Sequence, residues 1–263
     1  MVPTSELVAF CHQLADASGA VLRRHFRRNL AIESKRDASP VTIADRETEA
    51  ALRGAIEKRF PDHGVRGEEL GSVRLDAEYV WILDPIDGTR SFITGKPLFV
   101  TLIGLVRRGQ AILGVIDQPI TNERWIGGDD VPTTLNTAPV RVRTNVELRE
   151  AVLFTTSPSY GTHPTWATQP ERDALRRLMD DVHLRHYSAD AYAFGLLAAG
   201  WVDLVAESAL EPHDFCAAIP VVRGAGGVIT DWDGAPLDCS RKSNVLAAGS
   251  KALHTAALQR LRR

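Results

Sequence analysis

The segment Trp81-Ile82-Leu83-Asp84-Pro85-Ile86-Asp87-Gly88-Thr89 joins an apolar run to a sharp turn. The run that precedes Asp84 has the length and composition of a buried β-strand. Pro85 ends regular strand pairing, and Gly88 permits a tight turn. Such a turn can direct the carboxylates of Asp84 and Asp87, with a backbone carbonyl, toward one point. An oxygen-rich group of this kind suits Mg²⁺, although Asp, Pro and Gly also form ordinary β-turns.

The sequence around this segment predicts an N-terminal half built from helices and antiparallel strands. Hydrophobic periodicity predicts amphipathic helices over 5–28 and 42–60, a hairpin formed by 99–106 and 111–116, and a short strand at 123–126. The polar stretch 127–139 reads as a loop. We therefore place a boundary here, with an α+β subdomain at 1–142 that carries Glu68, Asp84 and Asp87.

The C-terminal half, 143–263, carries Asp214 and alternates between strands and helices. We expect strands at 151–155, 202–206, 227–230 and 245–248, and helices at 171–181, 189–200, 214–223 and 251–261. This alternation predicts an α/β fold in which mixed sheets pack against helices.

Composition excludes several classes of protein. The 263 residues include 31 basic and 33 acidic side chains, so no positive field exists to hold nucleic acid or an anionic membrane surface. No run of apolar residues is long enough for a transmembrane helix, and the N-terminus lacks the pattern of a signal peptide. The three cysteines have no zinc-binding spacing and read as reduced thiols. These features favour a cytoplasmic enzyme.

Three further carboxylates have ordinary explanations when each is taken alone. Glu68 lies in an acidic loop, Asp45 suits the first turn of a helix, and Asp214 could cap another helix. His213, next to Asp214, could contact a substrate, although a solvent-facing histidine is the favoured interpretation. The combination of these carboxylates with Asp84 and Asp87 carries the functional argument.

In combination, these motifs resemble the inositol monophosphatase-like superfamily of Mg²⁺-dependent phosphatases. The resemblance rests on four elements in the family's order: Thr42-Ile43-Ala44-Asp45, Gly67-Glu68-Glu69, Trp81–Thr89, and Asp214-Phe215 through Gly224-Ala225-Gly226-Gly227. Residues 90–99, 116–119 and 123–127 are most similar to the histidinol-phosphate phosphatase branch. Asp190 stands within the site where inositol enzymes carry Gly-Thr-Ala, and a carboxylate suits an amine better than a hydroxyl.

The resemblance implies a metal-dependent hydrolysis. Two or three Mg²⁺ ions would be bound by Glu68, Asp84, the Ile86 carbonyl, Asp87 and Asp214. Thr89 would orient a metal-activated water, with Asp45 accepting a hydrogen bond from Thr89 and Glu68 sharing the role of base. The expected reaction converts L-histidinol phosphate to L-histidinol and phosphate, in histidine biosynthesis, without a phospho-enzyme.

The resemblance also implies a set of substrate contacts: Asp87, Gly88, Thr89, Arg185, Asp190, Glu207 and Asp214. The backbone N–H groups of Gly88 and Thr89 would hold phosphate oxygens, as turn amides do. Asp190 and Glu207 would face the cationic end of the substrate, although a helix start and a strand end also explain them. Arg185 would contact the phosphate or a neighbouring subunit, with a surface salt bridge equally favoured. Lys35 would offset charge near Asp45.

The implied fold is a layered α/β/α/β/α sandwich with the site in the cleft between the halves. The family is typically homodimeric, and Trp125 and Trp166 are candidate interface aromatics. One alternative is an inositol monophosphatase, or a phosphatase with broad specificity for small molecules, of the same fold. A remote alternative is a metal-binding protein without catalytic activity.

Overall fold

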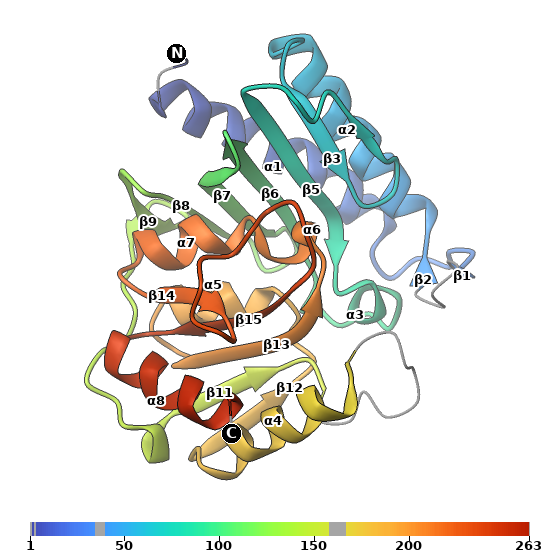
Figure 1. The fold of residues 1–263 in the computed structure, drawn as a ribbon. Coiled ribbons are helices and arrows are strands. Elements are labelled where there is room, and N and C mark those ends of the chain that lie inside the picture. Colours follow the sequence, from blue (N-terminus) through green and yellow to red (C-terminus); the bar gives the residue numbers. More distant parts are fainter. Residues whose placement is uncertain (1, 3, 35–39, 158–166, 263) are drawn as a thin grey trace.

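The computed structural model describes residue 2 and residues 4–34, 40–157 and 167–262. Two sheets and three groups of helices alternate in layers (Figure 1). Helices α1 (Thr4–His25) and α2 (Ile43–Arg59) cover the outer face of the larger sheet. Helices α5 (Tyr192–Ala198), α6 (Pro212–Phe215) and α7 (Ala218–Gly224) lie between the sheets, and α4 (Gln169–Asp180) and α8 (Lys251–Leu261) form the last layer. The expected α/β/α/β/α sandwich is therefore confirmed.

The larger sheet has eight strands in the order β10-β9-β8-β7-β6-β5-β3-β4. Their bounds are β3 Gly64–Gly67, β4 Ser72–Val73, β5 Tyr79–Asp87, β6 Val100–Arg107, β7 Gln110–Gln118, β8 Glu123–Gly128, β9 Val131–Leu135 and β10 Ala138–Pro139. Within this sheet, only the β3–β5 pair is parallel. A short helix, α3 (Thr89–Ile93), follows β5, and the small pair β1 (Glu33–Ser34) and β2 (Pro40–Val41) precedes α2.

The smaller sheet has five strands in the order β12-β11-β13-β15-β14. Their bounds are β11 Val152–Thr155, β12 Leu184–Tyr187, β13 Leu204–Leu210, β14 Val228–Asp231 and β15 Ser243–Ala248, and a single 3₁₀ turn at Leu148–Glu150 precedes them. Strand β11 pairs in parallel with both β12 and β13, whereas β15 runs antiparallel to its neighbours. The carboxyl ends of β11 and β13 therefore meet at one edge of the sheet.

The first residues of β5 are buried in an aromatic cluster, which we define as Phe10, Phe60, His63, Tyr79 and Trp81. The Phe10 ring meets Phe60 edge-on at 5.1 Å and Trp81 at 5.6 Å. The indole N–H of Trp81 donates to Nδ1 of His63 over 3.1 Å, so its one polar group is satisfied inside the core. This cluster anchors α1 and α2 to the larger sheet.

A row of glycines lets the middle layer lie directly against the larger sheet. Gly104, Gly114 and Gly127 are cross-strand partners on β6, β7 and β8. A Cβ on Gly114 would lie only 2.0 Å from the Ala217 carbonyl oxygen, and one on Gly127 would lie 2.9 Å from Cα of Val221. We call these three residues the glycine row. Because no side chain fits beneath α7, the chain that carries Asp214 is held close to β5.

Several predicted elements need correction. The stretch 127–139 is not a loop, because β9 and β10 continue the larger sheet through antiparallel pairing with β8. The helix expected at 214–223 is divided into α6 and α7. The helix expected from Ala189 begins at Tyr192, because Asp190 has a φ of 44°. The short strands β3 and β12 were not expected.

The placement of single residues also differs from expectation. Trp125 is fully buried and packs edge-on against the Tyr192 ring at 5.5 Å, so its assignment to a subunit interface is wrong. Lys35 and Trp166 lie outside the described residues. The two sheets fall on either side of residue 142, but one hydrophobic core joins residues of both halves. The division into two subdomains stays a prediction.

Across the described ranges, no helix combines the length and the apolar character that are needed to cross a membrane.

Candidate active site

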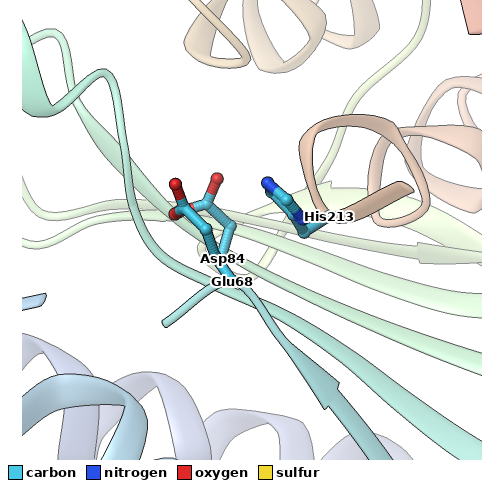
Figure 2. Close-up of side chains that lie close together, drawn as sticks. All are labelled: Glu68, Asp84 and His213. Carbon is cyan, nitrogen blue, oxygen red and sulfur yellow. The ribbon is translucent and has the colours of Figure 1, made fainter. Parts of the chain in front are cut away.

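The parallel pairing of β3 with β5 brings the first two carboxylates together. Gly67 lies opposite Leu83 in this register, so Glu68 follows β3 directly beside Asp84. The backbone N–H of Glu68 donates to the Leu83 carbonyl over 3.2 Å and continues the pairing by one residue. Asp84 is buried near the end of β5. Figure 2 shows the carboxylate oxygens of Glu68 and Asp84 side by side.

The turn after Asp84 is shaped by local hydrogen bonds. The register with β6 shifts between Asp84 and Asp87, and the Ile86 N–H donates to Oδ1 of Asp84 over 3.0 Å. Gly88 has a φ of 83°, a conformation that favours glycine, and it directly precedes α3. The Thr89 hydroxyl donates to the Ile86 carbonyl oxygen over 3.1 Å. The turn thus places both aspartates and this carbonyl on one short segment.

Asp214 reaches the same place from the middle layer. It occupies the first turn of α6, where its Oδ2 accepts a hydrogen bond from the Glu211 N–H over 2.7 Å. Its Oδ1 lies 3.4 Å from Nε2 of His213. Among the described residues, two sets of side chains bring their ligand atoms within 4.8 Å of each other. One set is Asp84, Asp87 and Asp214, and the other is Glu68, Asp84 and His213.

Burial and mutual repulsion act on these carboxylates. Burial raises the pKa of Asp84 well above its usual range, and the charges of Glu68 and Asp87 raise it further. Burial also raises the pKa of Asp87 well above its usual range, with added repulsion from Asp190 and Asp214. The pKa of Asp214 is raised chiefly by burial. A bound divalent cation would reverse this effect, because it favours the ionised form of each carboxylate.

Glu68, Asp87 and Asp214 open onto a cavity of about 420 Å³. Seven of the predicted site residues line it: Glu68, Asp87, Gly88, Thr89, Asp190, Glu207 and Asp214. The Ala191 N–H donates to Oδ2 of Asp87 over 2.6 Å, which ties the start of α5 to the turn after β5. The cavity therefore lies where the two halves of the chain meet, as expected.

A second group of polar side chains lies in this cavity: Thr156 follows β11, Glu207 lies within β13, and Asp190 precedes α5. The Thr156 hydroxyl lies 3.0 Å from Oε1 of Glu207 and 3.4 Å from Oδ1 of Asp190. Burial, together with the charge of Asp214, raises the pKa of Asp190 to about 6. We call Thr156, Asp190 and Glu207 the acidic triad. It concentrates negative charge in the same cavity as the metal-ligand candidates.

Four predicted residues are not among those that line the cavity. Asp84 and Ile86 are buried within β5. Asp45 is buried at the start of α2, where its Oδ2 accepts from the Thr42 N–H and hydroxyl over 2.7 and 2.8 Å. Its proposed hydrogen bond with Thr89 stays a prediction. Arg185 lies on the edge strand β12, where its guanidinium donates to the Met179 carbonyl and lies 3.3 Å from Asp180. This position does not support phosphate contact within one chain.

Other cavity-lining residues were missed. Arg90, Thr156 and Lys242 line the cavity without having been given a role there, and His213 also lines it. The expectation that His213 faces solvent is wrong, because its side chain is only 17% exposed. Thr156 could have been found, since it follows a predicted strand, and ligand contacts gather at the carboxyl ends of parallel strands.

The layered fold and the carboxylate-lined cavity are those of a metal-dependent phosphatase that acts on phosphoric monoesters. The chain belongs to the inositol monophosphatase family, whose model matches residues 4–263.

Similar proteins carry more than one substrate name. The chain is 48% identical over 257 residues to the chloroplastic bifunctional phosphatase IMPL2 of Arabidopsis thaliana, covering 94% of this chain and 72% of the relative. It is 35% identical to the histidinol-phosphatase of Chlorobaculum parvum, with 84% of each chain covered. The solved inositol monophosphatase of Zymomonas mobilis superposes with a TM-score of 0.89 at 38% identity, with 100% of both chains covered. These names agree on a phosphatase and differ on its substrate.

Proposed function

We propose that this protein is a Mg²⁺-dependent histidinol-phosphatase, which hydrolyses L-histidinol phosphate to L-histidinol and inorganic phosphate in histidine biosynthesis. The acidic triad is the observation that carries the choice of substrate. It places the carboxylates of Asp190 and Glu207 in the same cavity as the metal-ligand candidates. A substrate with a phosphate at one end and an amine at the other matches these two regions.

The donor set fits magnesium. Asp84, Asp87 and Asp214 offer carboxylate oxygens within 4.8 Å of one another, and hard divalent cations prefer oxygen ligands. The raised pKa values of all three aspartates also indicate a site that gains stability from a cation. We propose that Glu68, these three aspartates and the Ile86 carbonyl hold two or three ions. When bound, Mg²⁺ supplies the positive charge that acidifies a water and stabilises the leaving oxygen.

The chain's own residues would orient the reactants. Thr89 donates its hydroxyl hydrogen to the Ile86 carbonyl, so its oxygen keeps lone pairs that can accept a hydrogen bond from a water. Glu68 follows β3 beside Asp84 and would take the proton that the water loses. The backbone N–H groups of Gly88 and Thr89 would hold phosphate oxygens. Water attacks phosphorus, the ester P–O bond breaks, and the alcohol leaves with a proton from solvent.

The cationic end of the substrate would face the acidic triad. Thr156 has one hydroxyl hydrogen, so it donates to one of these two carboxylates at a time. An ammonium group carries a positive charge and three donors, so it can bind both carboxylates. Because both carboxylates are largely buried, this charge complementarity would favour an amine over an uncharged polyol.

An inositol monophosphatase is the second candidate. The similarity to the solved inositol monophosphatase of Zymomonas mobilis supports it. Fold and metal ligands would be unchanged, and only the occupant of the region near the acidic triad would differ.

The test is phosphate release from L-histidinol phosphate and from inositol 1-phosphate at equal concentration in millimolar Mg²⁺. We expect L-histidinol phosphate to have the higher kcat/KM. The variant Asp190→Asn should raise KM for histidinol phosphate by about tenfold or more, because it removes one charge from a buried pair. Its rate with inositol 1-phosphate should change little.

The matched control is Asp173→Asn, which makes the same change at an exposed site on α4. It should leave both rates unchanged. A clear preference for inositol 1-phosphate would refute the assignment of the substrate. An equal loss for both substrates in Asp190→Asn would refute the proposed role of Asp190.

We further propose a homodimer located in the cytoplasm. The edge strand β12 exposes Leu184 and Tyr187, which are 44% and 40% accessible, and Arg185 lies between them. Unpaired edges with apolar side chains favour association. Light scattering after size-exclusion chromatography should give twice the chain mass, and Leu184→Glu should weaken the dimer if this edge forms the interface. A monomeric wild-type protein would refute the proposal.

A further inference from the structure

His213 lies among the residues that we propose bind metal ions through oxygen. It is the second residue of α6, its side chain is largely buried, and it lines the cavity beside Asp214. One of its ring nitrogens lies within 4.8 Å of carboxylate oxygens of both Glu68 and Asp84. Figure 2 shows a ring nitrogen of His213 on the side that faces these two carboxylates.

The two groups of ligand atoms share Asp84 and differ in chemistry. The group formed by Asp84, Asp87 and Asp214 contains oxygen donors only, whereas the other combines Glu68 and Asp84 with an imidazole. An imidazole adds a ligand lone pair without adding negative charge to a region where carboxylates already repel one another. Imidazole nitrogen also favours transition metals over Mg²⁺, which prefers oxygen.

We propose that His213 is a metal ligand, and that with Glu68 and Asp84 it forms a mixed nitrogen–oxygen site for a transition-metal dication such as Mn²⁺ or Zn²⁺. The neighbouring all-oxygen group keeps its preference for Mg²⁺. This inference rests on the proposed metal-dependent function and adds to it a difference between two adjacent ion positions. The chain would therefore hold unlike metals side by side.

A simple ion pair is the competing role for His213. Its Nε2 lies 3.4 Å from Oδ1 of Asp214, and a protonated ring would offset the charge of that carboxylate. This role requires both ring nitrogens to carry protons, whereas metal binding requires one of them to present a lone pair. The two roles therefore differ in whether nitrogen contacts the ion.

The test is electron spin-echo envelope modulation on the full-length protein loaded with Mn²⁺, since this method detects ¹⁴N bonded to the ion. We expect nitrogen modulation in the wild type and its loss in His213→Gln, which keeps a polar side chain of similar reach. By calorimetry, Mn²⁺ and Zn²⁺ should each bind at least about tenfold more weakly to the variant, because a direct ligand is lost. Mg²⁺ affinity should change little.

The matched control is His183→Gln, which removes an exposed imidazole from the loop before β12 and should preserve the nitrogen modulation. Stoichiometric Mn²⁺ binding without nitrogen modulation in the wild type would overturn this inference and leave the proposed metal site intact. Failure of the wild type to bind any divalent ion would overturn the proposed function as well. An equal loss of Mg²⁺ and Mn²⁺ affinity in His213→Gln would also overturn the inference, since it would indicate disruption of the whole site.

Discussion

The two ends of strand β5 differ in the kind of side chain that they bury. At its beginning, Tyr79 and Trp81 lie in the aromatic cluster, where the indole N–H is satisfied by His63. At its end, Asp84 and Asp87 lie close to other buried carboxylates, and burial raises the pKa of both. One end therefore contributes apolar burial with its polar group paired, and the other concentrates like charges.

This difference separates stability from function along a single strand. Apolar burial in the aromatic cluster favours the folded state. The carboxylates at the other end oppose folding when they are ionised and no cation is bound. A protein retains buried like charges when its function needs them. The beginning of β5 therefore stabilises the fold, and its end carries the site residues.

The largest expected effect comes from Asp84→Asn. The amide oxygen can still accept the Ile86 N–H, but the charge that would hold the metal is lost. We expect phosphatase activity to fall by about 10³-fold or more, because charge stabilisation by a metal contributes several kcal/mol. The free energy of unfolding of the metal-free variant at pH 7 should rise, since a carboxylate with a raised pKa destabilises the folded state at that pH.

The wild type stripped with EDTA is the comparison for this variant. It should lose activity and regain it with Mg²⁺, whereas Asp84→Asn should not recover. Full activity in EDTA would contradict the role given to this end of β5.

Truncation in the aromatic cluster should lower stability and leave activity nearly unchanged, the reverse of what we expect for Asp84→Asn. Phe10→Ala removes a buried ring that packs against Phe60 and Trp81, and should lower the free energy of unfolding by about 3–5 kcal/mol. Activity per folded molecule should remain close to that of the wild type. Urea denaturation measures the loss, with Leu75→Ala as the control, because Leu75 is 54% exposed. A large drop in kcat with little loss of stability would show that the two ends are not separable.

The glycine row tests how the two halves are joined. Gly114→Ala places a Cβ against the Ala217 carbonyl oxygen and should destabilise the fold by about 1–3 kcal/mol. It should also lower activity, since displacement of α7 moves Asp214. Gly54→Ala is the control, because the space around Gly54 in α2 is open and alanine favours a helix. If Gly114→Ala is as stable and as active as Gly54→Ala, the close approach has no role in positioning the site.

The smallest effect concerns pH. Burial lowers the pKa of His63 below 6.5, and its Nδ1 accepts the Trp81 indole hydrogen. The unfolded state therefore binds more protons, so the free energy of unfolding should fall as the pH drops below 6.5 toward the lowered pKa, by at most about 1.4 kcal/mol per pH unit from this group. Denaturation at pH 7.0, 6.0 and 5.0 should show a shallower dependence in His63→Gln. An unchanged dependence would contradict this account.

Much of the site could be predicted from the sequence because its residues mark local boundaries. Asp84 ends an apolar run, Asp87 precedes Gly88, and Asp214 stands where a helix begins, and the order of these motifs along the chain supported the resemblance to the family. The layered fold followed from that resemblance, whereas the alternation of strands and helices by itself predicted only mixed sheets packed against helices.

The other features of the site and of the fold depend on tertiary contacts, which no local sequence pattern indicates. His213 lines the cavity only because α6 docks with that side toward Glu68. The glycine row would weaken three strands in isolation, and its value arises from α7 packed above it. Strand β9 contains Pro132 and polar residues, so pairing with β8 overrides its weak propensity.

The glycine row also implies an order of events during folding. Its three glycines belong to neighbouring strands in a continuous meander, whereas the helix above them comes from a distant part of the sequence. Local pairings close short loops and form fast, while distant contacts form late. We therefore expect the meander to form first and α7 to dock on it afterwards. Asp214 meets Asp84 only at that point, so the ability to bind metal would report the completion of folding.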